Sequence, residues 1–474
     1  MGGTHSAHGL PARAGARAFR VRSALFALLL LAVAAAGGVF PARAAAGLTD
    51  SIDAALAKSG VAASGTGVYI WDLDAARLLY SRNSAKELTP GSNMKLVTAA
   101  AALIEWGDVH RIPTDLFTPD VPVYEGVLYG NVYLRGLGDP SLSTLAYQRQ
   151  ELDMSTASFE AFGKRLKKDG VKRIRGRVLG DASWFDKQKT VSTWKPGLHL
   201  ECGPLSALSG NQGLDNGNRV REPATWAAAL LTASLRAAGI KVTGDPGSGR
   251  VPGTTRLLKR QYSAPLGVLL KRMNKASDNF FAEMLLKGLG KDFYDEGSTA
   301  AGAEASREAL RVCGVQDGTY VVEDGSGLSY GNRLTARGIV TLLGAMRQRD
   351  DFKTYYDSLA IAGKDGSLRQ RMRGTAAAGN AHAKTGTLNI ASSLSGYVKS
   401  RNEHRVAFAI LLNGDSVDAY RAWKTQDAIV ATLANATLAG RRLLLATPSR
   451  RQQVASALEA VHVVGSGLQP GVNP

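Results

Sequence analysis

One stretch, TPGSNMKLVTAAAAL at residues 89–103, predicts a helix that begins at or just before Ser92. Pro90 suits the start of a helix, and an Ala- and Leu-rich run follows. Residues three apart share one face of a helix, so the Ser92 hydroxyl and the Lys95 amine are expected to touch. A hydroxyl needs a nearby base to act as a nucleophile, and a lysine is such a base only where its pKa is lowered. Alone, Ser-x-x-Lys is a weak signal.

Two further motifs follow in chain order and supply what a Ser-x-x-Lys pair lacks. The first, Ser277-Asp278-Asn279, lies between two predicted helices. Ser277 is suited to pass a proton toward a leaving group, and Asn279 is suited to hold Lys95 and a substrate amide in place. Alone, this motif would be interpreted as an ordinary helix cap.

The second motif, Lys384-Thr385-Gly386-Thr387, lies on a predicted strand. Lys384 brings a second positive charge, which favours a neutral Lys95 and attracts a substrate carboxylate. Thr385 is suited to hydrogen-bond that carboxylate. Gly386 permits close approach to the strand.

The same arrangement predicts an oxyanion hole. The backbone N–H of Thr387 is expected to lie beside that of Ser92, at a helix N-terminus that favours negative charge. Chance is a poor explanation for three such motifs in this order, on a helix start, an inter-helix loop and a strand. Together they predict a serine that attacks a carbonyl and forms an acyl-enzyme.

The trio resembles the active site of serine β-lactamases and penicillin-binding proteins. Further stretches narrow the resemblance to low-molecular-mass class C penicillin-binding proteins, the D-alanyl-D-alanine carboxypeptidase/endopeptidase family. These stretches are YLRGLGDP at 133–140, GDASWFD at 180–186, PLSALS at 204–209 and DGSGLS at 324–329. The resemblance covers about residues 48–438.

The resemblance implies an α/β fold. A transpeptidase/β-lactamase-like domain, with an antiparallel sheet and flanking helices, is expected to be interrupted by a large insertion that contains a smaller nested one. The predicted catalytic domain comprises residues 47–108 and 263–438. The predicted insertion spans 109–262, with the nested subdomain at roughly 182–222.

The residue patterns change character at the same places. Between 109 and 262 the chain shows short strand-like pieces, at Val121–Val123, Gly130–Leu134 and Arg175–Leu179, and one longer helix at Pro223–Ala238. Helical patterns then resume at 265–275, 279–289, 300–313, 334–348 and 418–435. Strands are predicted at 65–72, 77–80, 382–384, 394–398 and 404–412.

By resemblance, the substrate is the peptide stem of peptidoglycan. Ser92 would attack the carbonyl of a D-Ala-D-X bond, water would hydrolyse the acyl-enzyme, and penicillin would acylate the same serine. Family members need no metal or cofactor, and no Cys/His cluster in the sequence has metal-ligand spacing. The balance between carboxypeptidase and endopeptidase action stays open, as does the oligomeric state.

Three residues bear on which stems are accepted. Asp181 matches a family residue that approaches the amine of a diaminopimelate side chain, and an ordinary turn residue is an equally good interpretation. Phe185 matches an aromatic neighbour. Tyr330 stands where the family often has an Arg that meets the stem's free carboxylate, and Arg333 is near but not equivalent. His382 is expected to be structural.

Residues 1–46 are predicted to be an export signal. Arginines precede an apolar run that ends at Val39, and PARAAA at 41–46 has small residues at cleavage spacing. An uncleaved membrane anchor is the alternative. The predicted location is the periplasm or cell envelope.

The formal net charge is +18, of which +13 lies beyond residue 46. The basic residues look dispersed and no nucleic-acid motif is present, so peripheral association with an anionic envelope is favoured over nucleic-acid binding. Cys202 and Cys313 either pair or remain separate buried thiols. Residues 439–474 are expected to form a loosely attached C-terminal tail.

Two other functions are alternatives to a peptidase. A β-lactamase needs a base that activates the deacylating water, and no convincing Glu motif lies between the first two motifs. The large insertion also argues against it. A wall-binding scaffold with a vestigial site is the other alternative, and the complete trio argues against that.

Overall fold

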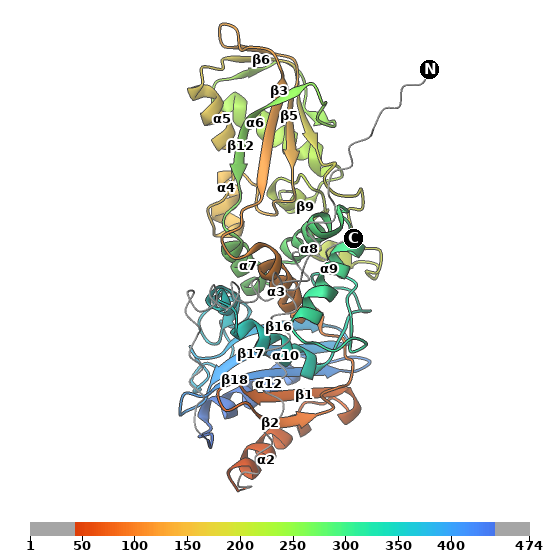
Figure 1. Ribbon diagram of the computed structural model, residues 1–474, viewed down its shortest axis with the longest axis vertical. Helices are drawn as coiled ribbons and strands as arrows, with labels where there is room; N and C mark the ends of the chain where they lie inside the picture. The colour runs from red at the N-terminus through yellow and green to blue at the C-terminus, as the bar shows by residue number, and fades with distance from the viewer. Residues whose placement is uncertain (1–42, 441–474) are drawn as a thin grey trace, which may run out of the picture.

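The computed structural model describes residues 43–440. Residues 1–42 of the predicted export signal, and the predicted tail beyond Gly440, lie outside the described residues. The molecule is elongated (Figure 1), with one large sheet at its lower end, a second group of sheets at its upper end, and three helices between them. Those helices are α3 (Met94–Trp106), α7 (Leu266–Lys275) and α8 (Asn279–Tyr294).

The lower sheet is antiparallel throughout and has six strands. Their order across the sheet is β15 (Ala360–Ile361), β16 (His382–Leu388), β17 (Ala391–Lys399), β18 (Arg405–Asn413), β1 (Thr66–Asp72) and β2 (Arg77–Arg82). Both faces are covered by helices, so the central strands β17 and β18 are buried on both sides along almost their whole length. Strand β18 is apolar without alternation, whereas β17 carries three buried serines. This is the antiparallel sheet with flanking helices that the sequence predicted.

Strand β18 shows how the two faces are divided. Phe408 and Ile410 point into a core shared with α2 (Arg43–Ala57) and α12 (Ala419–Asn435). Ala409 and Leu411 point into the opposite core, which includes residues of α3, α7, α8 and α10 (Ala336–Arg347). Side chains of successive strand residues point to opposite faces, so one strand serves both cores.

The upper end contains two sheets. The larger has the order β11 (Gly247–Ser248), β7 (Val178–Asp181), β5 (Val132–Gly136), β3 (Pro113–Pro119) and β12 (Thr255–Tyr262), and the smaller has the order β10 (Lys241–Val242), β6 (Arg173–Arg175) and β4 (Val127–Tyr129). Helices α5 (Phe159–Lys168) and α6 (Pro223–Ala237) pack against each other here, around a separate apolar core that includes Phe162 and Leu231.

The remaining elements are short or peripheral. Helix α9 (Thr299–Val312) packs against α8, and α11 (Phe352–Ser358) packs against α7. The small elements are α4 (Leu145–Tyr147) and the two-residue strands β8 (Leu214–Asp215), β9 (Asn218–Arg219), β13 (Tyr320–Val321) and β14 (Arg333–Leu334). Within residues 43–440, no helix combines the length and the apolar character that a membrane span requires.

Three expectations from the sequence are answered by the structure. Val121–Val123 is not a strand, and Pro122 at its centre has no N–H to give to a ladder. The predicted strand Arg175–Leu179 is two strands in different sheets, divided at Gly176, where an added Cβ would lie 2.1 Å from the carbonyl oxygen of Gly130. Cys202 and Cys313 are both buried and free, so they do not pair.

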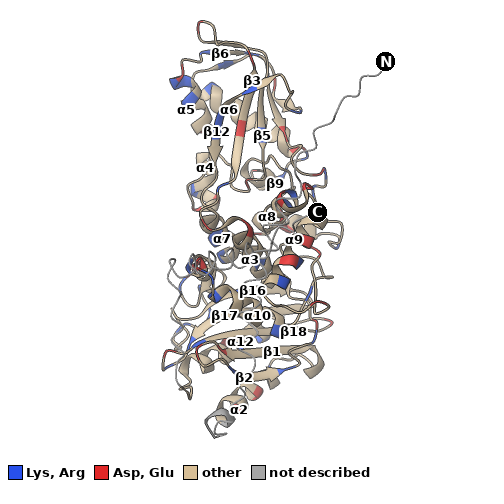
Figure 2. Cartoon of the chain, viewed as in Figure 1, with Lys and Arg blue, Asp and Glu red and all other residues tan. Residues whose placement is uncertain are grey.

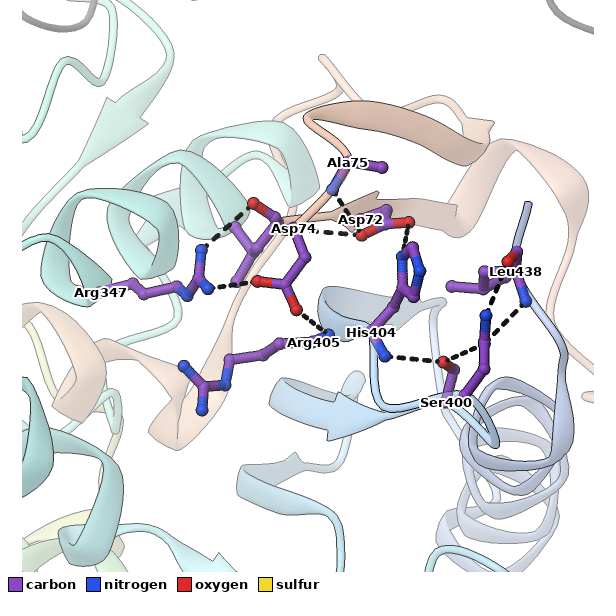
Figure 3. Close-up of polar contacts among 10 residues, drawn as sticks. Asp72, Asp74, Ala75, Arg347, Ser400, His404, Arg405 and Leu438 are labelled. Carbon is purple, nitrogen blue, oxygen red and sulfur yellow. Dashed lines mark hydrogen bonds and ion pairs between the residues drawn. The ribbon is translucent and has the colours of Figure 1, made fainter. Parts of the chain in front are cut away.

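A buried polar network ties the turns of the lower sheet together (Figure 3). The His404 Nδ1 atom lies 2.8 Å from the Asp72 Oδ2 atom, and both side chains are almost fully buried. Asp74 is paired with Arg347 of α10 and accepts the backbone N–H of Arg405 at 2.7 Å. The network therefore joins the β1–β2 turn, the start of β18 and α10.

Candidate active site

The predicted serine–lysine pair is formed at the start of α3. The chain enters this helix through a 3₁₀ turn, Gly91–Asn93, and α3 begins at Met94. The Lys95 side chain is fully buried, and its Nζ atom lies 3.0 Å from Ser92 Oγ. The one-turn spacing read from the sequence therefore produces the expected contact.

Lys95 has two more partners, and both can only accept a hydrogen bond. Its Nζ atom lies 2.7 Å from Asn279 Oδ1 and 2.7 Å from the carbonyl oxygen of Ser326. The amide of Asn279 is oriented by its own Nδ2 atom, which donates to the carbonyl oxygen of Glu201 at 2.8 Å. A neutral amine has two hydrogens and one lone pair, so the lone pair is left facing the Ser92 hydroxyl.

The second lysine is held by the second serine. Lys384, on β16, is fully buried, and its Nζ atom donates to Ser277 Oγ at 2.9 Å and to the carbonyl oxygen of Thr385 at 2.9 Å. Ser277 lies between α7 and α8 with a φ of 57°, in the left-handed region that costs a non-glycine residue about 1–3 kcal/mol. Such strain is found where a side chain has to be aimed at a site.

Burial controls the charge of both lysines. It lowers the pKa of Lys95 to about 8, against the opposing charges of Asp324, Glu283 and Asp278. Burial, followed by the positive charge of Lys95, lowers the pKa of Lys384 well below its usual value. Two buried ammonium groups so close together disfavour each other, so a neutral Lys95 is favoured when Lys384 is charged.

Two buried acids hold the loop that carries the Ser326 carbonyl. Glu283, on α8, accepts the backbone N–H of Ser326 at 2.7 Å and that of Gly325 at 3.1 Å through one oxygen, while its other oxygen has no partner among the described residues. Burial, with the charge of Asp324, raises the pKa of Glu283 to about 8. Asp324 accepts the N–H of Gly327 at 2.8 Å and the Trp194 indole N–H at 2.8 Å.

The two backbone N–H groups predicted for the oxyanion hole lie on adjoining segments. A Cβ added at Gly386 would lie 2.9 Å from the backbone nitrogen of Ser92, and one added at Gly91 would lie 3.3 Å from that of Thr387. Only residues without a side chain allow this approach between β16 and the helix start. Thr385, next to Lys384, directs its hydroxyl to Ser367 Oγ at 2.8 Å.

Asp181 and Phe185, two of the residues predicted to bind the stem, have their contacts outside this cluster. Asp181 accepts the backbone N–H of Ser183 and that of Val251, both at 2.8 Å, which accounts for both of its oxygens as a turn residue would. Phe185 is buried, and its ring fills the space over Gly138. Both residues line a separate hollow of about 670 Å³ to which none of the predicted catalytic residues contributes. Their substrate-binding role stays a prediction.

Tyr330 has a positively charged neighbour that the sequence did not reveal. The Nζ atom of Lys195 lies 3.9 Å from the centre of the Tyr330 ring. Arg333 donates to the carbonyl oxygen of Tyr330, so it supports the backbone of this residue. His382 stacks on Tyr356 with ring centres 3.9 Å apart, as expected of a structural residue.

Sequence reasoning missed Glu283, Trp194 and Lys195. Glu283 lies four residues after Asn279, one helical turn along α8, and this spacing was the available signal. Trp194 and Lys195 come from the predicted nested segment, and nothing in the sequence ties that segment to Asp324 or Tyr330. Within residues 43–440, no group of three or more His, Cys, Asp or Glu side chains is arranged to hold a metal ion.

Known proteins resemble this chain in sequence and in fold. A D-alanyl-D-alanine carboxypeptidase of Actinomadura sp. (strain R39) is 32% identical over 90% of this chain and 92% of its own length. Carboxypeptidase DacB of Mycolicibacterium smegmatis is 29% identical over 77% of this chain and 80% of its own length. The crystal structure of penicillin binding protein 4 (dacB) from Haemophilus influenzae shares the fold, with a TM-score of 0.67, 22% identity, and coverage of 81% of this chain and 97% of that one.

The family model for the D-Ala-D-Ala carboxypeptidase 3 (S13) family matches residues 48–200 and 206–436. These ranges include Ser92, Lys95, Ser277, Asn279 and Lys384 and most of the described chain. The chain belongs to the D-Ala-D-Ala carboxypeptidase 3 (S13) family.

Proposed function

We propose that this protein hydrolyses D-alanyl-D-X bonds in peptidoglycan stem peptides through an acyl-enzyme on Ser92. One observation carries the proposal. Lys95 is fully buried, two of its three partners are obligate acceptors, and the third is the Ser92 hydroxyl at 3.0 Å. A neutral Lys95 therefore has its lone pair directed at the proton that Ser92 must lose.

Acylation follows from this geometry. Lys95 takes the Ser92 proton as Ser92 Oγ bonds to the carbonyl carbon of the D-alanyl residue, and the carbonyl oxygen becomes an oxyanion. The backbone N–H groups of Ser92 and Thr387 are proposed to stabilise that oxyanion. The tetrahedral intermediate then breaks its C–N bond, and the departing amine takes up a proton.

Ser277 is proposed to deliver the proton to the departing amine and to take its replacement from the Lys95 ammonium, which leaves Lys95 neutral again for deacylation. Its hydroxyl is held by Lys384 at 2.9 Å, and it lies on the loop directly before Asn279, which contacts Lys95. Lys384 and Thr385 are proposed to attract the terminal carboxylate of the stem. Water attacks the acyl-enzyme after the first product leaves, with Lys95 as the base, which releases the shortened stem and restores Ser92.

The reactive carbonyl of penicillin fits the same position. We propose that penicillin acylates Ser92 and that the adduct is long-lived. We also propose that cross-linked stems are cut as well as free ones, that residues 1–46 direct export, and that the enzyme acts in the periplasm or cell envelope.

Labelled penicillin tests the proposal directly. The full chain should retain one label per molecule, and Ser92→Ala should retain none. The same preparation should release D-Ala from a stem pentapeptide, with the products identified by mass spectrometry. Failure of both reactions in a folded preparation would refute the proposed function. Rapid catalytic turnover of penicillin would instead indicate a β-lactamase.

A further inference from the structure

The positive charge of the chain is concentrated in one short stretch of the upper sheets. Residues 109–262 contain 22 Lys and Arg against 14 Asp and Glu, whereas 47–108 and 263–440 together contain 27 against 25. Within residues 164–177 there are 8 basic residues and 1 acidic residue. The net positive charge of residues 109–262 therefore comes almost entirely from this stretch.

We call this cluster the distal basic surface. It consists of Lys164, Arg165, Lys167, Lys168, Lys172, Arg173, Arg175 and Arg177, all exposed except the half-buried Arg173. Helix α5 carries the first four, and β6 carries Arg173 and Arg175. Both elements lie at the end of the molecule farthest from the six-stranded sheet (Figure 2), away from α3 and the active site.

The charges of the distal basic surface are not neutralised by the protein. Among the described residues, none of its eight members forms an ion pair with a carboxylate. The single acid of the stretch, Asp169, is engaged by Lys259 from β12 at 2.6 Å. Arg175 lies over the Tyr129 ring at 5.6 Å, which leaves its guanidinium edge exposed.

Helix electrostatics explain only part of this arrangement. Arg165, Lys167 and Lys168 lie in the last turn of α5, where cations are favoured by the helix dipole. That explanation does not reach β6, where Arg173 and Arg175 point to one face of the sheet and Ile174 between them points into the core that Phe162 and Leu166 of α5 also line. Placing so many like charges together disfavours the isolated protein, so a compensating partner is indicated.

We propose that the distal basic surface binds a phosphodiester-bearing polymer attached to the cell wall and so holds the enzyme on its substrate. Side chains two apart on a strand are separated by about 6–7 Å, a spacing that suits charges repeated along a linear chain rather than one compact anion. Arginine adds paired donors that match phosphate oxygens. The choice of a wall polymer rests on the proposed function, because peptidoglycan is where this enzyme would work.

Two other partners are less well supported by the surface. Binding to an anionic membrane would be stronger with exposed aliphatic side chains that insert among the lipids. Near β4 and the cations of β6, the exposed large apolar side chains are two tyrosines, Tyr124 and Tyr129, and Arg175 covers the ring of Tyr129. Nucleic-acid binding through single strands relies on aromatic rings that are free to stack on bases, and of the two tyrosines here Arg175 covers Tyr129.

The test is sedimentation of the full chain with purified cell walls that carry phosphodiester-linked polymer, and with the same walls after hydrofluoric acid has removed it. The surface variant is Lys164→Gln, Lys168→Gln, Arg173→Gln and Arg175→Gln combined. The matched control removes the same charge elsewhere, with Lys58→Gln, Lys364→Gln, Arg369→Gln and Lys424→Gln combined. Thermal unfolding and penicillin labelling of Ser92 show that each variant is folded.

We expect binding of the wild-type chain to fall at least about tenfold on the stripped walls and to weaken steeply with added salt. The surface variant should lose binding by a similar factor, and the control variant by less than about twofold. Equal binding to intact and stripped walls would overturn the proposal, as would equal losses in the two variants. Binding to phosphatidylglycerol vesicles or to duplex DNA without binding to walls would also overturn it. Penicillin labelling reports the proposed function separately, so each can fail alone.

Discussion

The rate at which penicillin acylates Ser92 should rise with pH through the range in which Lys95 loses its proton. The pKa of Lys95 is lowered to about 8, and only the neutral amine can accept the Ser92 proton. The neutral fraction is then about 1% at pH 6, about 9% at pH 7 and about 50% at pH 8. The second-order rate constant should therefore rise about ninefold from pH 6 to pH 7, about fivefold from pH 7 to pH 8, and level off above that.

Stopped-flow acylation with a chromogenic β-lactam measures this profile, and Glu283→Gln perturbs it. Gln keeps an oxygen that accepts the N–H groups of Gly325 and Ser326, but it cannot ionise. Glu283, whose pKa is raised to about 8, becomes a carboxylate over the same pH range in which Lys95 loses its proton, and that carboxylate favours a charged Lys95. The midpoint of the profile should move to lower pH. Glu87→Gln, at an exposed position, is the control and should leave the midpoint in place.

Two results would contradict this reasoning in different ways. A rate that is independent of pH between 6 and 8, in a chain with intact Ser92, would exclude Lys95 as the base. A pH profile with the expected rise but the same midpoint in Glu283→Gln would retain the base and exclude the coupling between Lys95 and Glu283.

Three further outcomes are expected. Lys195→Ala should raise KM about threefold to fivefold for stems with a free side-chain carboxylate, since it removes the cation beside Tyr330, and amidated stems should be unaffected. Burial raises the pKa of Asp139 to about 6, so the folded state keeps a proton that the unfolded chain releases near pH 4. The free energy of unfolding should therefore fall as the pH rises from 4 to 6. In urea denaturation, Asp139→Asn should lack this dependence on pH. Asp72→Ala should lower the free energy of unfolding by about 3–5 kcal/mol, because it leaves the buried His404 without its partner, while penicillin labelling per folded molecule stays unchanged.

The sequence was sufficient for contacts that depend on local spacing. Ser92 and Lys95 are separated by one helical turn, so a helix start anywhere near residue 92 brings them together. Strand β18 was also predictable, since its apolar run from Val406 to Leu412 is long and uninterrupted. The division of Arg175–Leu179 into two strands was not, because it depends on the approach of Gly176 to Gly130 from another part of the chain.

Contacts between distant parts of the chain also explain why some residues of the site were not predicted from the sequence. The Ser326 carbonyl contacts Lys95 across 231 positions of sequence, and the loop that carries it is fixed by Glu283 and Asp324. A contact to a backbone carbonyl leaves no pattern in the sequence, since any residue type can supply the carbonyl. For Asp181 the sequence left a substrate-binding residue and a turn residue equally possible, and the structure adds that one of its oxygens accepts the backbone N–H of Val251 from a distant part of the chain.

The two buried lysines lead to a last expectation about the substrate itself. Lys384 is proposed to receive the terminal carboxylate of the stem, and an anion bound there favours a charged Lys384. A charged Lys384 disfavours a second charge on Lys95, so substrate binding should favour the neutral form that attacks Ser92. The acid limb of kcat should then lie at lower pH than the acid limb of kcat/KM, since the first reports the bound enzyme and the second the free one. Coincident limbs, measured with a stem pentapeptide, would show that the stem carboxylate does not act through Lys384. The arrangement of Lys384, Ser277 and Lys95 would in that case serve the leaving group alone.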